Sequence, residues 1–264
     1  MRARFPKPAG RYNETGINVS FIPKLPETIT QENLVTDILD WQLTLTTDHI
    51  LQAQGADPFV IQSRRPALLE SATDALKTGL PLLKPALAFE SFTVERVFHN
   101  YIQLGGGKSI RSPLIASELK NAHTVNICVC TIGPELENHA REMMNEDPVL
   151  SLALDALCSA AVEQLISEVC QYFEKQCAAS CFISQPLGPG MEGWTVAEGQ
   201  PVIFQLVDTD SIGVRLTDSG LMLPVKSASF LMGVSDTPFK NGNLCDFCNL
   251  KEICKYRGNL HHSQ

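Results

Sequence analysis

The sequence predicts an α+β protein with a metal-binding C-terminal tail, and three observations support this prediction. Apolar residues recur at helical spacing in several segments, most persistently over residues 147–176. Alternating or β-branched apolar runs at residues 85–104, 124–132 and 222–232 are typical of strands. Three cysteines stand close together in the segment NLCDFCNLKEICKYR, residues 243–257.

The composition narrows the class of protein. A chain of 264 residues with 44% hydrophobic residues can form one large domain or two small ones. A net charge of -8 makes nucleic acid and anionic membranes poor partners. No uninterrupted run of about 18 apolar residues is present, so we expect no segment to span a bilayer. Nine cysteines without a secretory signal indicate a reducing cytoplasm and metal chemistry rather than a disulfide framework.

The N-terminal third is predicted to be an arm followed by helices and strands. Residues 1–30 are rich in proline and poor in periodic apolar positions, which favours an extended arm. Helical spacing then predicts helices over residues 31–54 and 62–80. Two short strands are expected within residues 85–104, where β-branched and aromatic residues are frequent.

The segment Gly105-Gly106-Gly107-Lys108-Ser109 has some features of a phosphate-binding loop, but the spacing is wrong. The Walker pattern requires glycine at the position that Ile102 occupies. We therefore interpret the glycines as a turn between a strand and a helix, which Pro113 begins. The strand over residues 124–132 then places Cys128 and Cys130 on one face, as small buried hydrophobic residues. A further helix is expected from Glu135.

Residues 147–176 form the longest helical pattern and are apolar nearly all round, which predicts a buried central helix. Asp155, Ser159 and Glu163 fall on one face of it, at positions i, i+4 and i+8. One interpretation is that this face is simply the solvent-exposed side of the helix. The other is that the carboxylates contact a ligand amine or hydroxyl, with Glu163 facing a cavity lined by residues 186–194.

The last part of the body is predicted to be a loop, a helix and a hairpin. Glycine and proline dominate residues 184–194, and a helix is expected over residues 197–207. Thr217-Asp218-Ser219-Gly220 lies between two apolar stretches, which is typical of a hairpin turn. We divide the chain into an arm and first helix (1–44), a body (45–240) and a Cys-rich tail (241–264).

The tail carries a candidate metal site. Cys245, Cys248 and Cys254 have the spacing C-x2-C-x5-C, which allows three thiolates to converge on one centre. Thiolates suit zinc or an iron–sulfur cluster, and both usually take four ligands. We favour an iron–sulfur cluster, of the [4Fe–4S] type, because no second Cys or His pair completes a zinc ribbon. Reduced thiols without a metal remain the alternative.

The fourth ligand is not within the motif. Cys181 is the preferred candidate, because it begins the glycine-rich region where backbone can approach a cluster. A site with three protein ligands and one open iron is the alternative. The other candidates are Cys177, Cys170, Cys158, Cys128, Cys130, His261 and His262.

Five segments resemble the reactivation-domain family of cobalamin-dependent methionine synthase, and more closely its stand-alone relatives from anaerobes. They are GGKSIRSPLIASEL (106–119), CTIGPELE (130–137), DALCSAAVEQLISEV (155–169), PLGPGMEGW (186–194) and IGVRLTDSGLMLPVKSAS (212–229). The resemblance implies a C-shaped α+β fold with a twisted antiparallel sheet. In methionine synthase this fold binds S-adenosylmethionine and remethylates cobalamin after one-electron reduction. The stand-alone relatives also tend to end in a C-x-x-C tail.

The resemblance also implies ligand-binding residues, with two departures from the family pattern. The family loop reads Arg-x-x-Pro-Gly-Tyr, and here Pro186 stands at the Arg position and Met191 at the Tyr position. The Arg would pair with the ligand carboxylate, so its loss predicts weak binding of S-adenosylmethionine. The residues implied at the site are Glu163, Gly188, Pro189, Gly190, Met191, Thr217 and Asp218.

Three functions remain open from the sequence. The first is a cytoplasmic corrinoid-associated protein whose iron–sulfur cluster passes one electron to a corrinoid protein or corrinoid-dependent methyltransferase. The second is a non-catalytic module that binds a small molecule or a partner, with a structural metal in its tail. The third is S-adenosylmethionine-dependent methyl transfer to cobalamin. No catalytic residue is identified, because the histidines have no evident partners. They are His49, His99, His123 and His139.

Overall fold

The computed structural model describes residues 41–177 and 180–239, and for residues 62–64 the backbone alone. The expected arm and the cysteine motif of the tail lie outside this part of the chain. The elements run in the order α1 (Thr47–Ala53), α2 (Pro58–Arg64), α3 (Pro66–Gly79), η2 (Leu80–Leu82), β1 (Ala86–Val97), β2 (Tyr101–Leu104), η3 (Gly105–Gly107), β3 (Lys108–Arg111), α4 (Pro113–Glu118), β4 (Thr124–Thr131), α5 (Glu135–Met143), α6 (Pro148–Gln176), β5 (Phe182–Ile183), α7 (Val196–Leu206), η4 (Asp210–Ile212), β6 (Arg215–Leu216), β7 (Met222–Leu223) and β8 (Ser227–Ser235).

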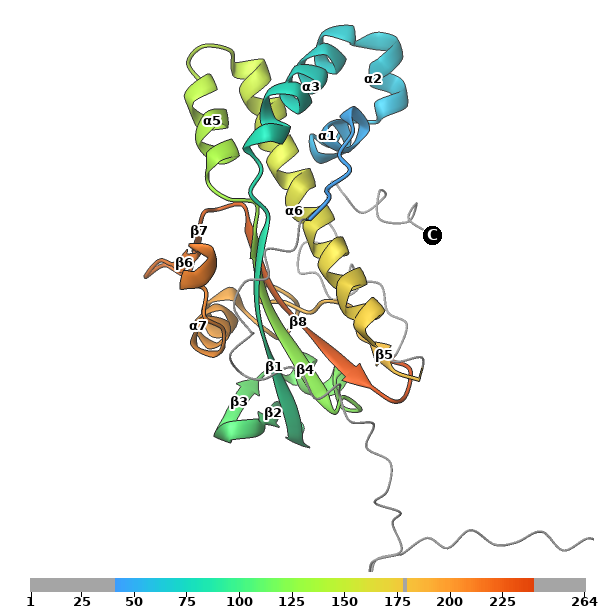
Figure 1. Cartoon of the computed structure of the whole chain (residues 1–264), viewed down its shortest axis with the longest axis vertical. Coiled ribbons are helices and arrows are strands. Elements are labelled where there is room, and N and C mark those ends of the chain that lie inside the picture. The colour runs from blue at the N-terminus through green and yellow to red at the C-terminus, as the bar shows by residue number, and fades with distance from the viewer. Residues whose placement is uncertain (1–40, 178–179, 240–264) are drawn as a thin grey trace, which may run out of the picture. The chain divides into compact units, whose positions relative to one another are not determined.

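The larger sheet has six antiparallel strands in the order β3-β2-β1-β4-β8-β5 (Figure 1). β1 pairs with β4 along its first part and with β2 at its end, and the register shifts between Val94 and Arg96. Such a β-bulge bends a strand and increases its twist, so the sheet curls at this point. The α+β antiparallel fold that the sequence predicts is therefore confirmed.

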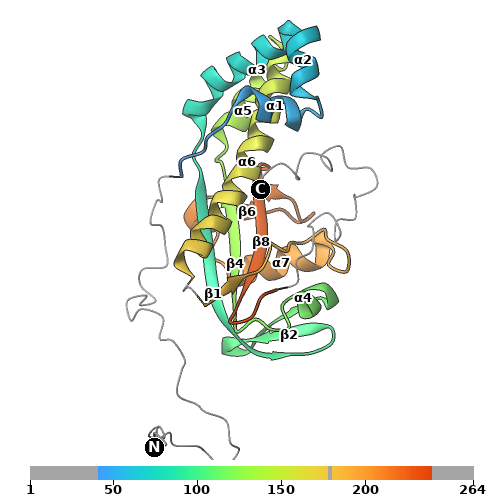
Figure 2. The ribbon, with the colours of Figure 1, turned by 90° about the vertical axis from the view of Figure 1, so that its right-hand side faces the viewer.

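Both faces of the central strands are covered (Figure 2). One face contributes Cys128, Cys130, Phe230 and Met232 to a buried cluster with α1, α3, α5 and α6, which we call the α6 cluster. The other contributes Ile127, Val129 and Leu231 to a cluster with α4 and α7, the α4–α7 cluster. Alternate residues of β4 and β8 thus point to opposite clusters, as the period of a strand requires. The predicted shared face of Cys128 and Cys130 is confirmed.

α6 crosses one face of the sheet as its main covering helix. The side chain of Asp147 accepts hydrogen bonds from the N–H groups of Val149 and Leu150, and Pro148 occupies the first helical position. By length and hydropathy α6 could cross a membrane, which the sequence analysis expected of no segment. Half of its most apolar window is buried inside the protein, which is typical of a core helix.

Several element boundaries differ from the sequence prediction. Residues 41–46 are not helical, and α1 begins only at Thr47, where Thr46 and His49 form a capping box. The helix expected over residues 62–80 is two helices, because Pro66 restricts Arg65 to a non-helical conformation. The glycines at 105–107 lead into β3 rather than directly into a helix. The last predicted strand is interrupted at the cis peptide between Leu223 and Pro224.

Candidate functional site

The glycine-rich loop between β5 and α7 is closed by its own hydrogen bonds. The N–H of Gly190 donates to the carbonyl of Trp194 at 2.8 Å. The N–H of Trp194 donates to the carbonyl of Met191 at 3.0 Å. The N–H of Gly188 donates to the thioether sulfur of Met191 at 3.4 Å. Gly190 has φ +100°, a conformation that favours glycine. The N–H groups of Gly188 and Gly190, two of the implied site residues, are thus used within the loop.

Close contacts seat this loop on the sheet and on α7. Leu187 forms a pair of backbone hydrogen bonds with Leu231 of β8, at 2.9 and 2.8 Å. A Cβ atom at Gly188 would lie 2.9 Å from the carbonyl oxygen of Ser229. A Cβ atom at Gly199 of α7 would lie 2.6 Å from Cγ of Pro189. Two glycines therefore allow backbone and proline to approach closely, which fixes the position of the loop.

The second predicted segment is the turn of the β6–β7 hairpin. The N–H of Thr217 donates to the carbonyl of Leu221 at 2.8 Å, and the N–H of Leu221 donates to Oγ1 of Thr217 at 3.0 Å. The hydroxyl groups of Thr217 and Ser219 are 3.0 Å apart. Asp218 is exposed at the tip. Thr217 therefore holds the turn together, and Asp218 presents its carboxylate to solvent.

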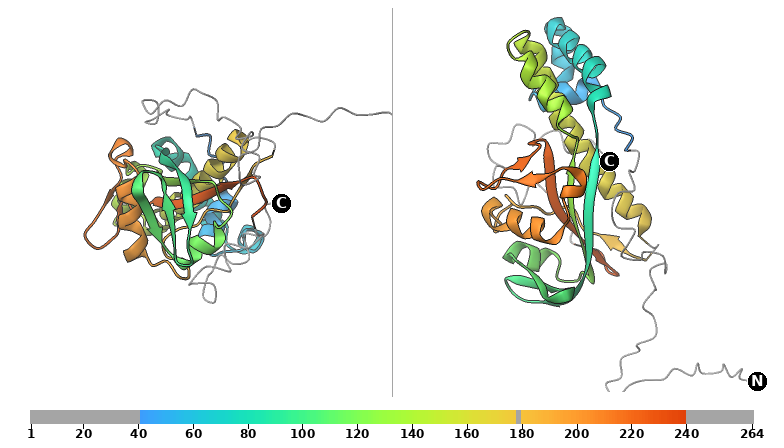
Figure 3. Two further views of the ribbon diagram at one scale, coloured as in Figure 1. Left: turned by 90° about the horizontal axis from the view of Figure 1, so that it is seen from below. Right: turned by 60° about the vertical axis from the view of Figure 1, so that its left-hand side comes forward.

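Val196, the first residue of α7, connects the loop to the hairpin. A Cβ atom at Gly190 would lie 3.5 Å from its Cγ2, and one at Gly220 would lie 4.0 Å from its Cγ1. Figure 3 shows the hairpin beside α7. The structure thus brings together the two segments that the family resemblance implied. We call them, with Val196, the loop–hairpin site.

Val196 was missed by the sequence analysis, although it directly follows the N-cap of a predicted helix. Thr195 and Glu198 form a capping box there. The carboxylate of Glu198 accepts hydrogen bonds from Thr195, and these bonds lower the pKa of Glu198. Val196 remains 42% exposed at this capped end. The site therefore carries one exposed apolar side chain, at the point where the loop and the hairpin turn both approach α7. The residues of this site include no evident nucleophile and base pair.

Glu163 does not belong to the loop–hairpin site, which corrects the expectation that it faces a cavity there. Glu163 lies on α6, whose buried residues belong to the α6 cluster, whereas Leu187 and Trp194 of the loop belong to the α4–α7 cluster on the other face of the sheet. Its side chain is exposed, although desolvation by its surroundings raises the pKa of its carboxyl group. Helical spacing indicated one face of α6 but not which element covers that face.

On the face of α6 that carries the three residues, Asp155 and Glu163 are exposed and Ser159 is half-buried, which favours the first interpretation. The amine partner of this face comes from within the chain: Nζ of Lys226 lies 2.9 Å from Oδ1 of Asp155 and 2.9 Å from Oγ of Ser159. Oε2 of Glu137 accepts a hydrogen bond from the N–H of Val225 at 2.9 Å. These contacts fix the segment before β8.

Four cysteines of the body are buried or half-buried thiols: Cys128, Cys130, Cys158 and Cys170. Burial raises the pKa of Cys130, Cys158 and Cys170 to about 12 and raises that of Cys128 well above its usual value. Without a metal, such thiols stay protonated at neutral pH. Among the described residues, no group of three or more His, Cys, Asp or Glu side chains is placed to hold a metal ion.

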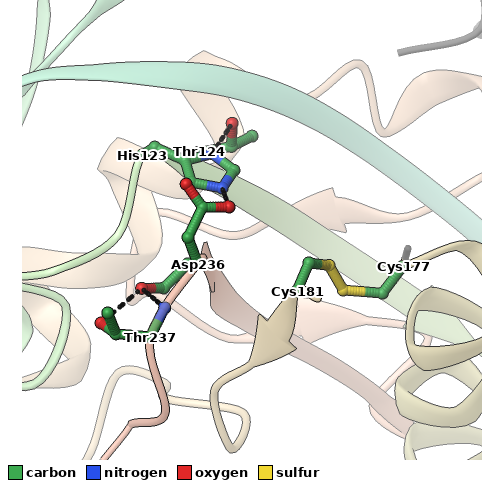
Figure 4. The surroundings of a disulfide bond; sticks show 7 residues. His123, Thr124, Cys177, Cys181, Asp236 and Thr237 are labelled. Atoms are coloured by element: carbon green, nitrogen blue, oxygen red, sulfur yellow. Dashed lines mark hydrogen bonds and ion pairs between the residues drawn. A yellow bond between two sulfur atoms is a disulfide. The ribbon is translucent and has the colours of Figure 1, made fainter. Parts of the chain in front are cut away.

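Cys181, the predicted fourth metal ligand, forms a disulfide with Cys177 in this structure (Figure 4). Its sulfur is therefore not a free thiolate in this form of the protein. Cys245, Cys248 and Cys254 lie outside the described residues. The metal site consequently stays a prediction, and its fourth ligand depends on the oxidation state of Cys181.

Comparison with known proteins supports the fold. The chain is similar to a crystal structure of the MetH reactivation domain bound to AdoHcy, with a TM-score of 0.50 and 16% sequence identity. The similarity covers 76% of this chain and 74% of that chain. No family model matches the sequence. No curated protein matches it either. The likeness to the reactivation domain is therefore one of fold, and it agrees with the resemblance found in the sequence.

Proposed function

We propose that this protein is a corrinoid-associated protein that acts on a corrinoid protein or corrinoid-dependent methyltransferase. The fold supports the proposal, because the similar structure is a reactivation domain and the same family was reached from five sequence segments. The net charge of -8 also disfavours nucleic acid and anionic membranes as partners.

The activity we propose is reductive activation of the corrinoid. Cobalt in such proteins drifts from the nucleophilic Co(I) form to inactive Co(II), and recovery requires an electron at low potential. A thiolate-bound iron–sulfur cluster can supply such an electron. Cys245, Cys248 and Cys254 would hold the cluster, with Cys181 as the fourth ligand. Lys255 and Arg257 beside the motif would offset part of its negative charge.

The test is metal analysis of protein purified without oxygen. We expect a brown protein that contains iron and acid-labile sulfide, and we expect Cys248→Ala to lose both. Cys170→Ser is the matched control, because this thiol lies on α6 and is not assigned to the cluster. Stoichiometric zinc without iron would contradict the redox proposal and would leave the non-catalytic module with a structural metal.

A second experiment tests the partner. Protein that carries the proposed iron–sulfur cluster is reduced chemically and mixed with a purified corrinoid protein in its Co(II) form. The formation of Co(I) is followed by absorbance. We expect wild-type protein to accelerate Co(I) formation and Cys248→Ala to have no effect. Equal rates with and without the protein would contradict the proposed activity even if a cluster is present.

Binding of S-adenosylmethionine is a second candidate function, because the similar structure contains AdoHcy. The loop–hairpin site would be the place for it. Pro186 and Met191 stand where the resembled family has Arg and Tyr, and the thioether of Met191 accepts the Gly188 N–H. Since the ligand carboxylate would lack its charged partner, we propose that the site binds this ligand weakly.

A further inference from the structure

An open pocket of about 500 Å³ lies between the end of β1 and α4, away from the residues of the loop–hairpin site. Pockets that hold small molecules have volumes of about 300–1,000 Å³ and are lined mainly by apolar side chains with a few polar groups. The apolar lining here consists of Val97, Phe98, Pro113 and Ala116. The polar lining consists of His99, Ser117 and Lys120. The pocket therefore has the size and the lining of a small-molecule site.

α4 supplies one wall of the pocket. Pro113, Ala116 and Ser117 are spaced i, i+3 and i+4, so they lie on one face of the helix. Ile115 and Leu119 anchor this segment, because both are fully buried in the α4–α7 cluster. The helical wall is thus fixed to the folded body.

The turn after β1 supplies the other wall, and stacked rings hold it in place. The N–H of Phe98 donates to the carbonyl of Tyr101 at 2.9 Å, which closes the turn. The two rings are stacked, with their centroids 4.3 Å apart and 9° between their planes. Arg111 of β3 lies 5.4 Å from the centroid of the Tyr101 ring. Because Tyr101 covers one face of Phe98, Phe98 presents its other face or its edge to the pocket, and both suit an aromatic ligand.

The polar groups at the pocket are hydrogen-bond donors. Lys120 carries an ammonium group, Ser117 carries a hydroxyl, and His99 has a ring N–H in every protonation state. No carboxylate is among the lining residues. Neither Lys120 nor His99 forms an ion pair within the described part of the chain. Both side chains are therefore available to an anionic ligand.

The pocket lies in a basic region of an acidic protein. Residues 95–123 contain four Lys or Arg residues and two Asp or Glu residues, whereas the whole chain has a net charge of -8. One of the two carboxylates, that of Glu95, accepts a hydrogen bond from Nε2 of Gln103 at 3.0 Å. Local positive charge raises the concentration of small anions at such a surface.

These observations point to a ligand with a flat apolar body and one negative charge. We propose that the pocket binds a small aromatic carboxylate. The ring of the ligand lies against Phe98 and Ala116, and its carboxylate accepts hydrogen bonds from Lys120, Ser117 and His99. A single ammonium group balances one carboxylate, whereas phosphate is commonly held by Arg pairs or main-chain N–H groups. The site goes beyond the proposed function and does not depend on it, since none of these residues belongs to the tail or to the loop–hairpin site.

The experiment is equilibrium dialysis of 2-naphthoate against the full-length chain. We expect saturable binding at one site with a dissociation constant of about 1 mM or lower, as a ligand of about 13 non-hydrogen atoms allows. Naphthalene-2-carboxamide has the same shape without the charge, and decahydronaphthalene-2-carboxylate has the charge without the aromatic rings. Each should bind at least about threefold more weakly than 2-naphthoate.

Three variants locate the bound ligand. Lys120→Met should weaken binding of 2-naphthoate by about 3- to 10-fold and leave binding of the amide unchanged. Ser117→Phe places a ring in the pocket and should abolish binding of both compounds. Lys108→Met is the matched control, because Lys108 is also an exposed cation of the basic region but does not line the pocket. It should bind as wild type does. All three positions are exposed, and the urea midpoint of each variant verifies its fold.

Several results would overturn the inference. One is the absence of saturable binding of 2-naphthoate up to about 10 mM. Wild-type affinity in Ser117→Phe would place the ligand elsewhere, and wild-type affinity in Lys120→Met would remove the proposed charge partner. An equal loss in Lys108→Met would show general attraction to the basic region rather than a site. Equal binding of the amide or of the saturated acid would exclude recognition of the charge or of the aromatic rings, respectively.

Discussion

Nζ of Lys226 lies 2.9 Å from Oδ1 of Asp155, and this ion pair ties the residue before β8 to the N-terminal half of α6. The same ammonium donates to Oγ of Ser159 at 2.9 Å. From the other side, Oε2 of Glu137 on α5 accepts the N–H of Val225. The segment between the hairpin and β8 is thus held by two helices, which positions the loop–hairpin site relative to the body.

Replacing Lys226 should therefore destabilise the protein more than removing an ordinary surface charge. The Lys226 side chain is 18% exposed, whereas that of Asp155 is 61% exposed, which weakens the ion pair through screening. We expect Lys226→Met to cost about 1–2 kcal/mol, mainly through the lost charged hydrogen bonds. The measurement is the urea midpoint of unfolding.

The comparison for Lys226 is Arg141→Met, which removes an i,i+4 pair between a 68% exposed arginine side chain and Oε1 of Glu137, and does not remove the acceptor of the Val225 N–H, Oε2 of Glu137. Such pairs contribute about 0.3–0.5 kcal/mol. Equal small effects of the two substitutions would show that Lys226 does not anchor the segment.

Gly199→Ala should displace the glycine-rich loop. The added Cβ would lie 2.6 Å from Cγ of Pro189 and 2.8 Å from Cε2 of Trp194. Alanine is otherwise favoured over glycine inside a helix, so a net loss would reflect overpacking, for which about 1–3 kcal/mol is typical. In a Trp41→Phe background, the emission of the buried Trp194 should shift to the red.

The control for Gly199 is Gly105→Ala, where the nearest atoms to an added Cβ lie 3.9 Å away. We expect this change to leave the emission of Trp194 and the unfolding midpoint nearly unchanged. A Gly199→Ala protein with wild-type stability and emission would show that the loop can move away from α7 freely.

Some features of this fold are determined by neighbouring residues, whereas others depend on contacts between distant segments. Asp147 and Pro148 mark the start of α6 through capping, and the Gly-Pro pattern marks the loop, so both were predictable from neighbouring residues. The meeting of Gly190 and Gly220 at Val196 depends on the register of Leu187 with β8 and on the hairpin. No short-range pattern encodes that register, so only the family resemblance linked the two segments.

Glu163 illustrates the converse case. Its place on the same face of α6 as Asp155 and Ser159 was correct, because the helical period fixes it. Which face of the sheet α6 covers is a tertiary property. The alternation of Phe230 and Leu231 between the two buried clusters decides it. The side chain therefore points away from the site to which the resemblance assigned it.

Glu163→Gln should change the pH dependence of stability rather than ligand binding. Desolvation raises the pKa of Glu163 in the folded protein, so the folded state holds this proton more tightly than the unfolded state. Between the unfolded pKa and the higher folded pKa, unfolding therefore releases a proton, and stability falls as pH rises. The substitution should remove this fall and leave the protein slightly more stable at pH 7.

Because Glu163 is exposed, the gain should stay within about 0.5 kcal/mol. Urea unfolding at pH 4 and pH 7 measures it, with Glu168→Gln on the same helix as the charge control. A loss of stability at pH 7 that is absent at pH 4 would show that the ionised carboxylate of Glu163 has a stabilising partner.

S-Adenosylmethionine should bind wild-type protein weakly, and an arginine at position 186 should strengthen binding. A charged hydrogen bond contributes about 1.5–3 kcal/mol, so restoring it should raise affinity by about 10- to 150-fold. Pro186 has no N–H, so its replacement removes no backbone hydrogen bond, whereas Met191→Tyr would remove the acceptor of the Gly188 N–H.

Titration calorimetry on wild type, Pro186→Arg and the uncharged control Pro186→Met separates charge from side-chain length. Low-micromolar binding by wild type would show that other residues hold the ligand carboxylate, and equal affinities of the two variants would show that position 186 does not face it.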